Sequence, residues 1–148
     1  MIARISTNLP CSEEQLWEKI TDPKSLQFVA SPVLKFIPVG KNDLDKEWEL
    51  NQDYNLNLYL FGFIPLGRHR IRVVNIDRGK NKIESSESGL LARVWNHTIL
   101  FWETDRKLVH YTDIIEIKAG LLTPFIWAFA HLFYRHRQRR WKQLFERL

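Results

Sequence analysis

Two residues on consecutive strand-like stretches of the sequence are suited to acid–base chemistry. His97 lies within the β-rich run 94–104 and Asp113 within the run 108–119, and a short polar turn at 105–107 joins the two. Such a turn predicts a hairpin whose strands lie side by side. A carboxylate that accepts a hydrogen bond from an imidazole fixes its tautomer and raises its basicity. His97 and Asp113 are therefore candidate catalytic residues, with His97 as the general base.

The register of this hairpin decides whether the two side chains meet. If Glu103 pairs with Leu108, then Thr98 lies opposite Asp113 and His97 faces the other side of the sheet. A slip of one residue, or a β-bulge, places His97 and Asp113 together. There are two alternatives to a catalytic pair. His97 and Asp113 either form a buried hydrogen bond with a purely structural role, or they do not interact.

Aromatic residues accompany this pair and supply candidate contacts for an apolar ligand. Tyr111 and Asp113 are two positions apart on a predicted strand, so they share one face and could orient a ligand hydroxyl or carbonyl. The candidate ligand-binding residues are Trp95, His97, Tyr111, Asp113, Phe129 and Phe133. The alternative interpretation is that the aromatic residues belong to the hydrophobic core and contact no ligand.

Other kinds of active site find little support in the sequence. The five histidines show no spacing typical of a metal site. The sequence has no phosphate-binding glycine loop, no dinucleotide fingerprint and no G-x-S-x-G motif. We therefore expect no metal and no other cofactor. Cys11 has no identifiable base near it, and we expect it to be a small, semi-buried residue.

The sequence also bears on where the protein works. A single cysteine excludes an internal disulfide, and the N-terminal residues lack the apolar segment and cleavage site of a secretory signal. No apolar run reaches the length that a membrane-spanning helix needs. We therefore expect a cytoplasmic protein.

Periodicity and helix caps predict the elements that position the candidate residues. Ser12 and Asp22 are helix caps, and they predict two short helices after a first strand over 2–9. Alternating apolar and polar residues over 47–60 predict one long, half-buried strand. Further strands are predicted at 33–37, 68–77, 82–88, 94–104 and 108–119, with the polar strand 82–88 at or near a sheet edge.

The last segment is predicted to form one long helix. Gly120 ends the preceding strand, Thr123 can cap the helix, and apolar residues spaced by three and four over 125–148 form one broad stripe. This helix is the only predicted element long enough to cover the sheet. The predicted fold is α+β, with a curved antiparallel sheet of about seven strands wrapped on the C-terminal helix and a cavity between them. With 148 residues, 45% of them apolar, we expect one ligand-binding domain over 1–148.

The charge of the chain is concentrated at its C-terminal end. The net charge is +5, while residues 1–134 hold 16 basic and 16 acidic residues, so the excess lies within 135–148. A single basic helix end does not make the basic stripe of a nucleic-acid-binding protein, and we expect no nucleic acid partner. Arg137, Arg139 and Arg140 either form a solvated helix face or contact an anionic membrane or another acidic partner. The segment 120–134 is apolar nearly all round, which predicts either an exposed patch or a helix start covered on both sides.

The order of elements resembles that of the START-like, or SRPBCC, superfamily, which includes Bet v 1-like helix-grip proteins and polyketide cyclases. The resemblance covers nearly the whole chain and begins with the strand and helix over 5–20. Its more specific part is Trp95-Asn96-His97, followed by Tyr111-Thr112-Asp113-Ile114-Ile115 and then Phe133-Tyr134-Arg135-His136-Arg137. Similar motifs occur in a bacterial subgroup of START-like domains without assigned function. That subgroup often has a second histidine, at a position that is Ile99 here.

The resemblance implies binding of a small hydrophobic or amphipathic molecule, such as a lipid, an isoprenoid or a polyketide-like compound. Because the superfamily includes carriers, receptors and enzymes, its fold does not decide its function. One alternative is a cyclase or dehydratase with His97 as the general base. Another is a membrane-surface or partner-binding module that uses the basic end of the last helix.

Overall fold

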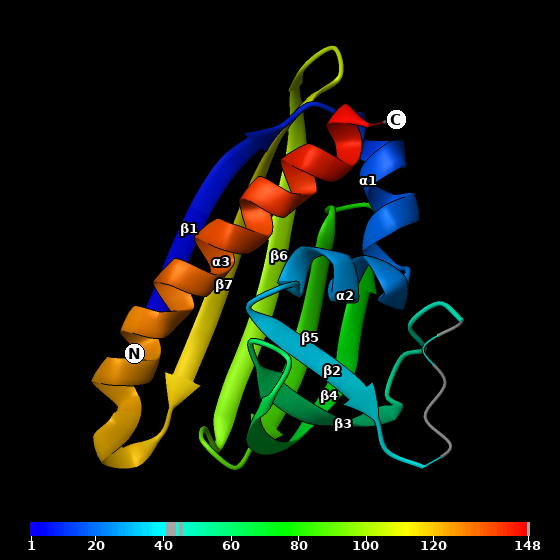
Figure 1. The fold of residues 1–148 in the computed structure, drawn as a ribbon. Helices are drawn as coiled ribbons and strands as arrows, with labels where there is room; N and C mark the ends of the chain where they lie inside the picture. The colour runs from blue at the N-terminus through cyan, green and yellow to red at the C-terminus, as the bar shows by residue number, and fades with distance from the viewer. Residues whose placement is uncertain (41–43, 45, 148) are drawn as a thin grey trace.

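The chain folds into an antiparallel sheet with two short helices after the first strand and a long helix at its C-terminal end (Figure 1). The computed structural model describes residues 1–40, 44 and 46–147. The strands are β1 (Ile2–Leu9), β2 (Leu34–Pro38), β3 (Asp53–Leu60), β4 (Ile64–Asp77), β5 (Lys82–Gly89), β6 (Val94–Asp105) and β7 (Leu108–Lys118). The helices are α1 (Glu13–Ile20), α2 (Pro23–Ala30), the short 3-10 helix η1 (Gly120–Leu122) and α3 (Thr123–Glu146). The predicted α+β helix-grip fold is confirmed.

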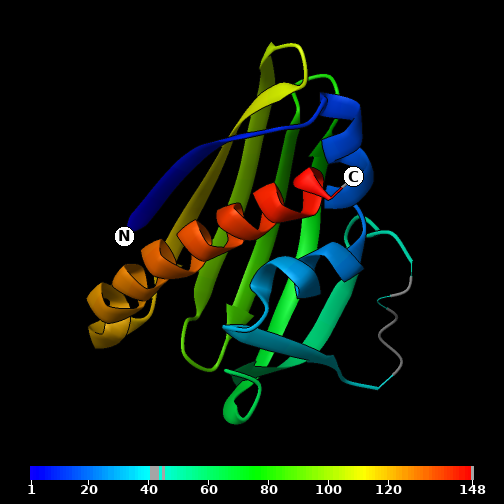
Figure 2. The same cartoon turned by 45° about the horizontal axis from the view of Figure 1, so that its top comes forward.

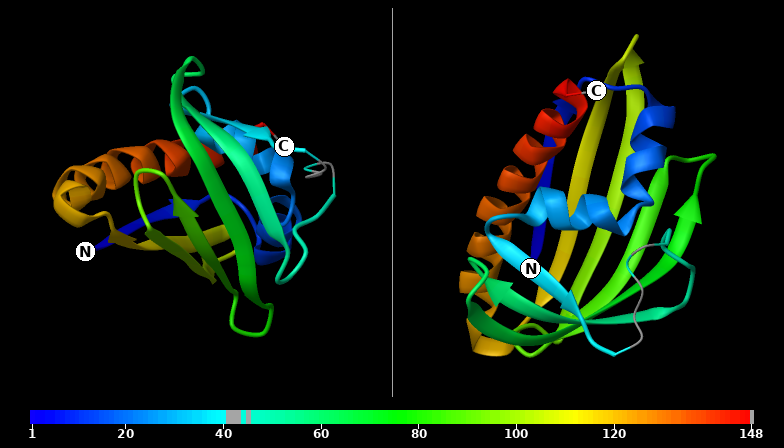
Figure 3. Two further views of the ribbon diagram at one scale, coloured as in Figure 1. Left: turned by 90° about the horizontal axis from the view of Figure 1, so that it is seen from below. Right: turned by 45° about the vertical axis from the view of Figure 1, so that its right-hand side comes forward.

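One sheet holds the seven strands of the described residues, in the order β1-β7-β6-β5-β4-β3-β2, and every pair of neighbours is antiparallel. The sheet curves, and α3 crosses it diagonally on the same side as α1 and α2 (Figures 2 and 3). A curved sheet and a straight helix touch along only part of their length. The arrangement therefore leaves interior space between α3 and the strands furthest from β1.

The starts of α1 and α2 follow the predicted capping signals. The Ser12 hydroxyl accepts a hydrogen bond from the Gln15 amide, and the Gln15 side chain accepts one from the Ser12 amide. The Asp22 carboxylate accepts from the Lys24 amide at the start of α2. The predicted cap at Thr123 is wrong, because α3 begins at Thr123 after Leu122 and no side chain caps this end. The Thr123 hydroxyl instead accepts from the Ala119 amide and donates to the Gly120 carbonyl. In the described part of the chain, no helix is both long and apolar enough to cross a membrane.

The core consists of two clusters that share α3. Ala130, Phe133 and Tyr134 join one cluster, which contains residues of β1, β3, β4 and β7. Trp141 and Phe145 join the other, which includes Trp17 of α1 and Phe101 of β6. The second cluster packs one end of the sheet against α1 and α3.

The strand predicted over 47–60 is shorter than expected. Strand β3 begins at Asp53, because Asn51 has a left-handed backbone with φ of 61° that interrupts the extended chain. Leu50 makes an isolated parallel bridge to Val73 instead. Strand β4 in turn begins at Ile64, four residues before its predicted start.

The predicted edge position of the polar strand is wrong. Strand β5 lies in the middle of the sheet, between β6 and β4. Its inward positions include Ser85 and Glu87, which are polar because they face an interior cavity where other polar groups lie nearby. A polar strand therefore occupies a position where an apolar one is usual.

Candidate functional site

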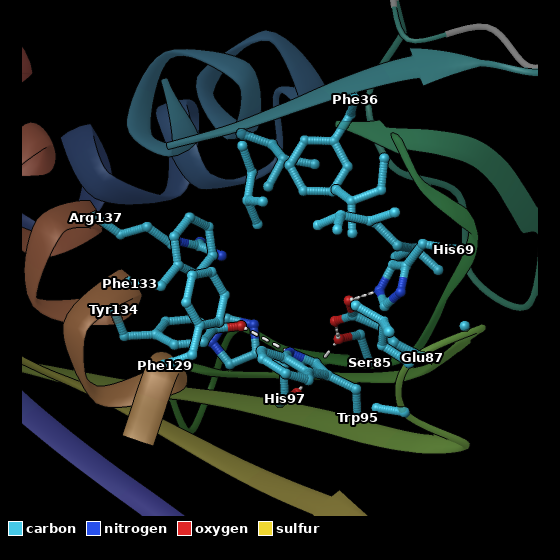
Figure 4. A pocket seen from close by; sticks show the side chains of 18 of the residues that line it. Phe36, His69, Ser85, Glu87, Trp95, His97, Phe129, Phe133, Tyr134 and Arg137 are labelled. Atoms are coloured by element: carbon cyan, nitrogen blue, oxygen red, sulfur yellow. Dashed lines mark hydrogen bonds and ion pairs between the residues drawn. The ribbon is translucent and has the colours of Figure 1, made fainter. Parts of the chain in front are cut away.

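A cavity lies between α3 and the sheet, with a volume of about 320 Å³ (Figure 4). Ligand sites in proteins usually measure about 300 to 1,000 Å³ and are mainly apolar. The walls come from β2 to β6 together with α2 and α3, and include Leu26, Phe36, Leu58, Ile71, Ile99 and Ile126. The cavity therefore has the size and character of a site for a small apolar molecule.

One end of the cavity opens to the surface through an apolar rim. Phe125 at the start of α3 lines the cavity and is 75% exposed, and Leu90 in the β5–β6 loop lines it and is 78% exposed. Leu121 and Leu122 are also exposed beside Phe125. Part of the apolar segment 120–134 is thus at the surface and not covered on both sides.

The structure brings His97 and Asp113 together. Glu103 pairs with Val109 and a bulge follows it, so Ile99 lies opposite Asp113 and His97 shares its face of the sheet. His97 Nε2 donates to Asp113 Oδ1 at 2.7 Å. His97 lines the cavity, whereas Asp113 is fully buried behind it.

Asp113 is the centre of a buried hydrogen-bond network. The Tyr111 hydroxyl donates to Asp113 Oδ1 at 3.0 Å, and Gln138 Nε2 of α3 donates to Asp113 Oδ2 at 3.0 Å. Neither Tyr111 nor Asp113 is among the cavity-lining residues, so both lie behind the wall instead of forming the predicted contact face. Their position suits them to hold His97.

The remaining predicted contacts do line the cavity. Trp95 lies beside His97 on the sheet side, and its Nε1 donates to the Tyr134 hydroxyl at 3.0 Å. The rings of Phe129 and Phe133 stack with centroids 5.8 Å apart on the helix side. Figure 4 shows these side chains on adjoining walls.

The network keeps Asp113 ionised. Burial alone would raise the pKa of this carboxyl, but the hydrogen bond and charge of His97, together with Arg137 and Gln138, outweigh burial and lower the pKa below 3.8. Burial and the neighbouring Asp113 raise the pKa of Tyr111 well above 10. Tyr111 is therefore a neutral donor to an anionic acceptor.

A second polar group, which no sequence motif indicates, lies on another wall. His69 Nε2 of β4 donates to Glu87 Oε1 at 2.9 Å, and the Ser85 hydroxyl donates to Glu87 Oε2 at 2.6 Å. Burial alone would raise the pKa of Glu87, but His69, His97 and Ser85 outweigh it and lower the pKa. The signal for it in the sequence is the run of polar residues over 82–88, which is also typical of a strand at or near a sheet edge.

The predicted surface role of Arg137 is wrong. This side chain is only 6% exposed and lines the cavity, since it lies on the stripe of α3 that faces the sheet. Arg140 donates from Nε to the Phe28 carbonyl and lies over the Phe28 ring. Arg139 is exposed, as expected for a surface contact.

Cys11 is fully buried, and burial together with the charge of Glu103 raises the pKa of its thiol to about 12. A thiol with this pKa stays protonated and is a poor nucleophile near neutral pH. Within the described residues, no three side chains of His, Cys, Asp or Glu are grouped so that they could hold a metal ion.

We predict that the Asp113 network makes stability depend on acid pH. Replacing Asp113→Asn leaves His97, Tyr111 and Gln138 with a poorer acceptor and should lower the free energy of unfolding by about 3 to 5 kcal/mol near neutral pH. The pKa of Asp113 in the folded state lies below the ordinary value of 3.8. The ionised carboxylate therefore contributes fully to stability above pH 3.8, and this contribution is lost as pH falls through the folded-state pKa. Urea unfolding at a series of pH values measures the difference between wild type and variant, which should narrow in acid. Asp105→Asn, at the exposed end of β6, is the matched control, and a difference independent of pH would contradict the prediction.

Solved structures with this fold support the expected START-like architecture. A protein from Chromobacterium violaceum has a TM-score of 0.76 at 13% identity, covering 98% of this chain and 96% of that one. A START superfamily protein from Mycobacterium smegmatis has a TM-score of 0.71 at 10% identity, covering 99% of this chain and 97% of that one. DynU16, a protein of the dynemicin biosynthetic locus, has a TM-score of 0.65 at 13% identity. The aligned region covers 98% of this chain and 47% of DynU16. At these identities the likeness shows the fold alone, and the START-like fold is confirmed.

Sequence comparison places the chain in a family. No curated protein matches it significantly. The family model described as "Domain of unknown function (DUF8410)" matches residues 7–145, which is nearly the whole chain. The chain therefore belongs to the DUF8410 family, and its fold is START-like.

Proposed function

We propose that residues 1–148 act as one domain that binds a small hydrophobic or amphipathic molecule in the cavity between the sheet and α3. The observation that carries the proposal is an apolar cavity of about 320 Å³ with an apolar opening and several polar side chains inside it. This volume is at the lower end of the range for ligand sites, which favours a single-chain lipid, a short isoprenoid or a compact polyketide-like molecule over a two-chain lipid.

The proposed contacts follow from the walls of the cavity. Phe129 and Phe133 of α3 and Trp95 of β6 offer apolar surface, and His97 offers a polar contact held in place by Asp113. Tyr111 and Asp113 support the site from behind and do not touch the ligand. A START superfamily protein and a protein of a biosynthetic locus among the structural neighbours are consistent with this proposal.

We predict that filling the cavity abolishes binding of an apolar probe. Leu58 lines the cavity from β3, so Leu58→Trp should occupy the space that a ligand needs. The probe is N-phenylnaphthylamine, an uncharged fluorophore whose emission increases in an apolar site. Its fluorescence should increase with wild type and should stay near the buffer value with Leu58→Trp.

The matched control is Ile37→Trp, which adds the same side chain at a position on β2 that is 39% exposed. This variant should bind the probe like wild type, and both variants should melt cooperatively. If Leu58→Trp gave the same probe fluorescence as wild type, the probe would bind outside the cavity, and this result would contradict the proposal. Mass spectrometry of small molecules extracted from the purified wild type then identifies natural ligands.

A second candidate function is favoured by the His97–Asp113 pair. We propose, as the alternative, proton abstraction from a bound substrate of a cyclase or dehydratase type, with His97 as the general base. Because His97 Nε2 donates to Asp113, Nδ1 is the ring nitrogen left to accept a proton. The apolar walls would exclude water from the reacting atoms.

Nitrobenzisoxazole tests this alternative, because a base that removes the proton from its isoxazole carbon breaks the N–O bond and opens that ring to a coloured cyanophenolate. We predict that wild type accelerates ring opening over buffer, and that His97→Gln reduces the acceleration by about a hundredfold or more. The control His110→Gln changes a histidine that contacts Asn8 and Trp102, away from the cavity. Equal rates for wild type and His97→Gln would exclude His97 as a general base toward this probe.

A further inference from the structure

Arg137 is a buried cavity-lining side chain whose charge has no hydrogen-bond or ion-pair partner among the described residues. It is 6% exposed, and its Nε, which is shielded from solvent, makes no hydrogen bond within the described chain. Its guanidinium carbon lies 4.9 Å from the ring centre of Tyr134 and 5.9 Å from that of Phe133. Figure 4 shows Arg137 beside these rings on the helix side of the cavity.

The carboxylates near the cavity already have hydrogen-bond partners. Asp113 accepts from His97, Tyr111 and Gln138, and Glu87 accepts from His69 and Ser85. They act on Arg137 only through space. Burial alone would lower the pKa of Arg137, but Tyr134, Asp113, Tyr111 and Glu87 outweigh burial and raise it. Arg137 is therefore a charged group with unused donors.

A buried charge without hydrogen-bond partners is unfavourable, and the planar guanidinium fork matches a carboxylate in geometry and charge. We propose that the natural ligand of the cavity carries a carboxylate and that Arg137 binds it. This inference rests on the proposed ligand-binding function and specifies the chemical class of the ligand.

The position of Arg137 along α3 also orients the ligand. Arg137 lies twelve residues after Phe125, which marks the opening, and this separation corresponds to roughly 18 Å along a helix. The carboxylate would therefore sit at the inner end of the cavity, with its chain along Phe133 and Phe129 toward the apolar rim. A single-chain carboxylic acid fits this arrangement.

Dodecanoic acid and dodecanol are matched probes, because they have the same chain and differ in the charged head. Their affinities for wild type at neutral pH are measured by calorimetric titration. The acid should bind more tightly than the alcohol to wild type. In Arg137→Met, which keeps an apolar stem beside Tyr134, acid affinity should fall by about tenfold or more while alcohol affinity stays unchanged. Arg137→Gln should give the same loss and serves if the methionine variant does not fold.

Arg139→Met, at an exposed position on the same helix, is the control and should bind both probes like wild type. Equal binding of acid and alcohol to wild type would overturn the role of Arg137 while leaving the ligand-binding cavity intact. Equal weakening of both probes in the Arg137 variants would assign Arg137 a structural role and would also overturn the inference. Binding of neither probe, together with no fluorescence change with N-phenylnaphthylamine, would overturn the proposed function as well.

Discussion

The structure depends on the hydrogen bonds that Asp113 and Gln138 make where α3 meets the sheet. Gln138 Nε2 donates both to the Ile5 carbonyl of β1 and to Asp113 Oδ2 of β7, so one side chain of the helix joins two neighbouring strands. Asp113 extends the connection to His97 of β6. These bonds are fully buried, and their directionality holds α3 at one position on β1 and β7. The rest of the helix can then span the cavity without filling it.

The cavity combines an apolar lining with polar groups that give the fold little obvious benefit. Ser85 and Glu87 lie on a central strand where apolar residues would pack better, and Arg137 lies in the interior without a hydrogen-bond partner in the described chain. Proteins accept such unfavourable arrangements chiefly at functional sites. In a START-like fold, which hosts many functions, these residues and not the fold carry the functional argument.

Local signals predicted much of this protein. The helix caps at Ser12 and Asp22 depend on contacts within a few residues, and strand and helix periods reveal which face is buried. Within the site, the sequence also placed Trp95, His97, Phe129 and Phe133 at the cavity, because residues on one face of a strand or helix share the same neighbours.

The sequence by itself therefore determined the order of the elements, the caps of α1 and α2 and the apolar stripe of α3. Only the tertiary structure decided the register, because the bulge after Glu103 shifts every pairing of β6 with β7 by one residue and a strand period of two cannot reveal it. It also decided that β5 is central and that Arg137 is buried. Strand order depends on contacts between residues far apart in the sequence, and the burial of a charged residue on the stripe of α3 depends on the cavity that the sheet forms beside it, so no local pattern encodes either.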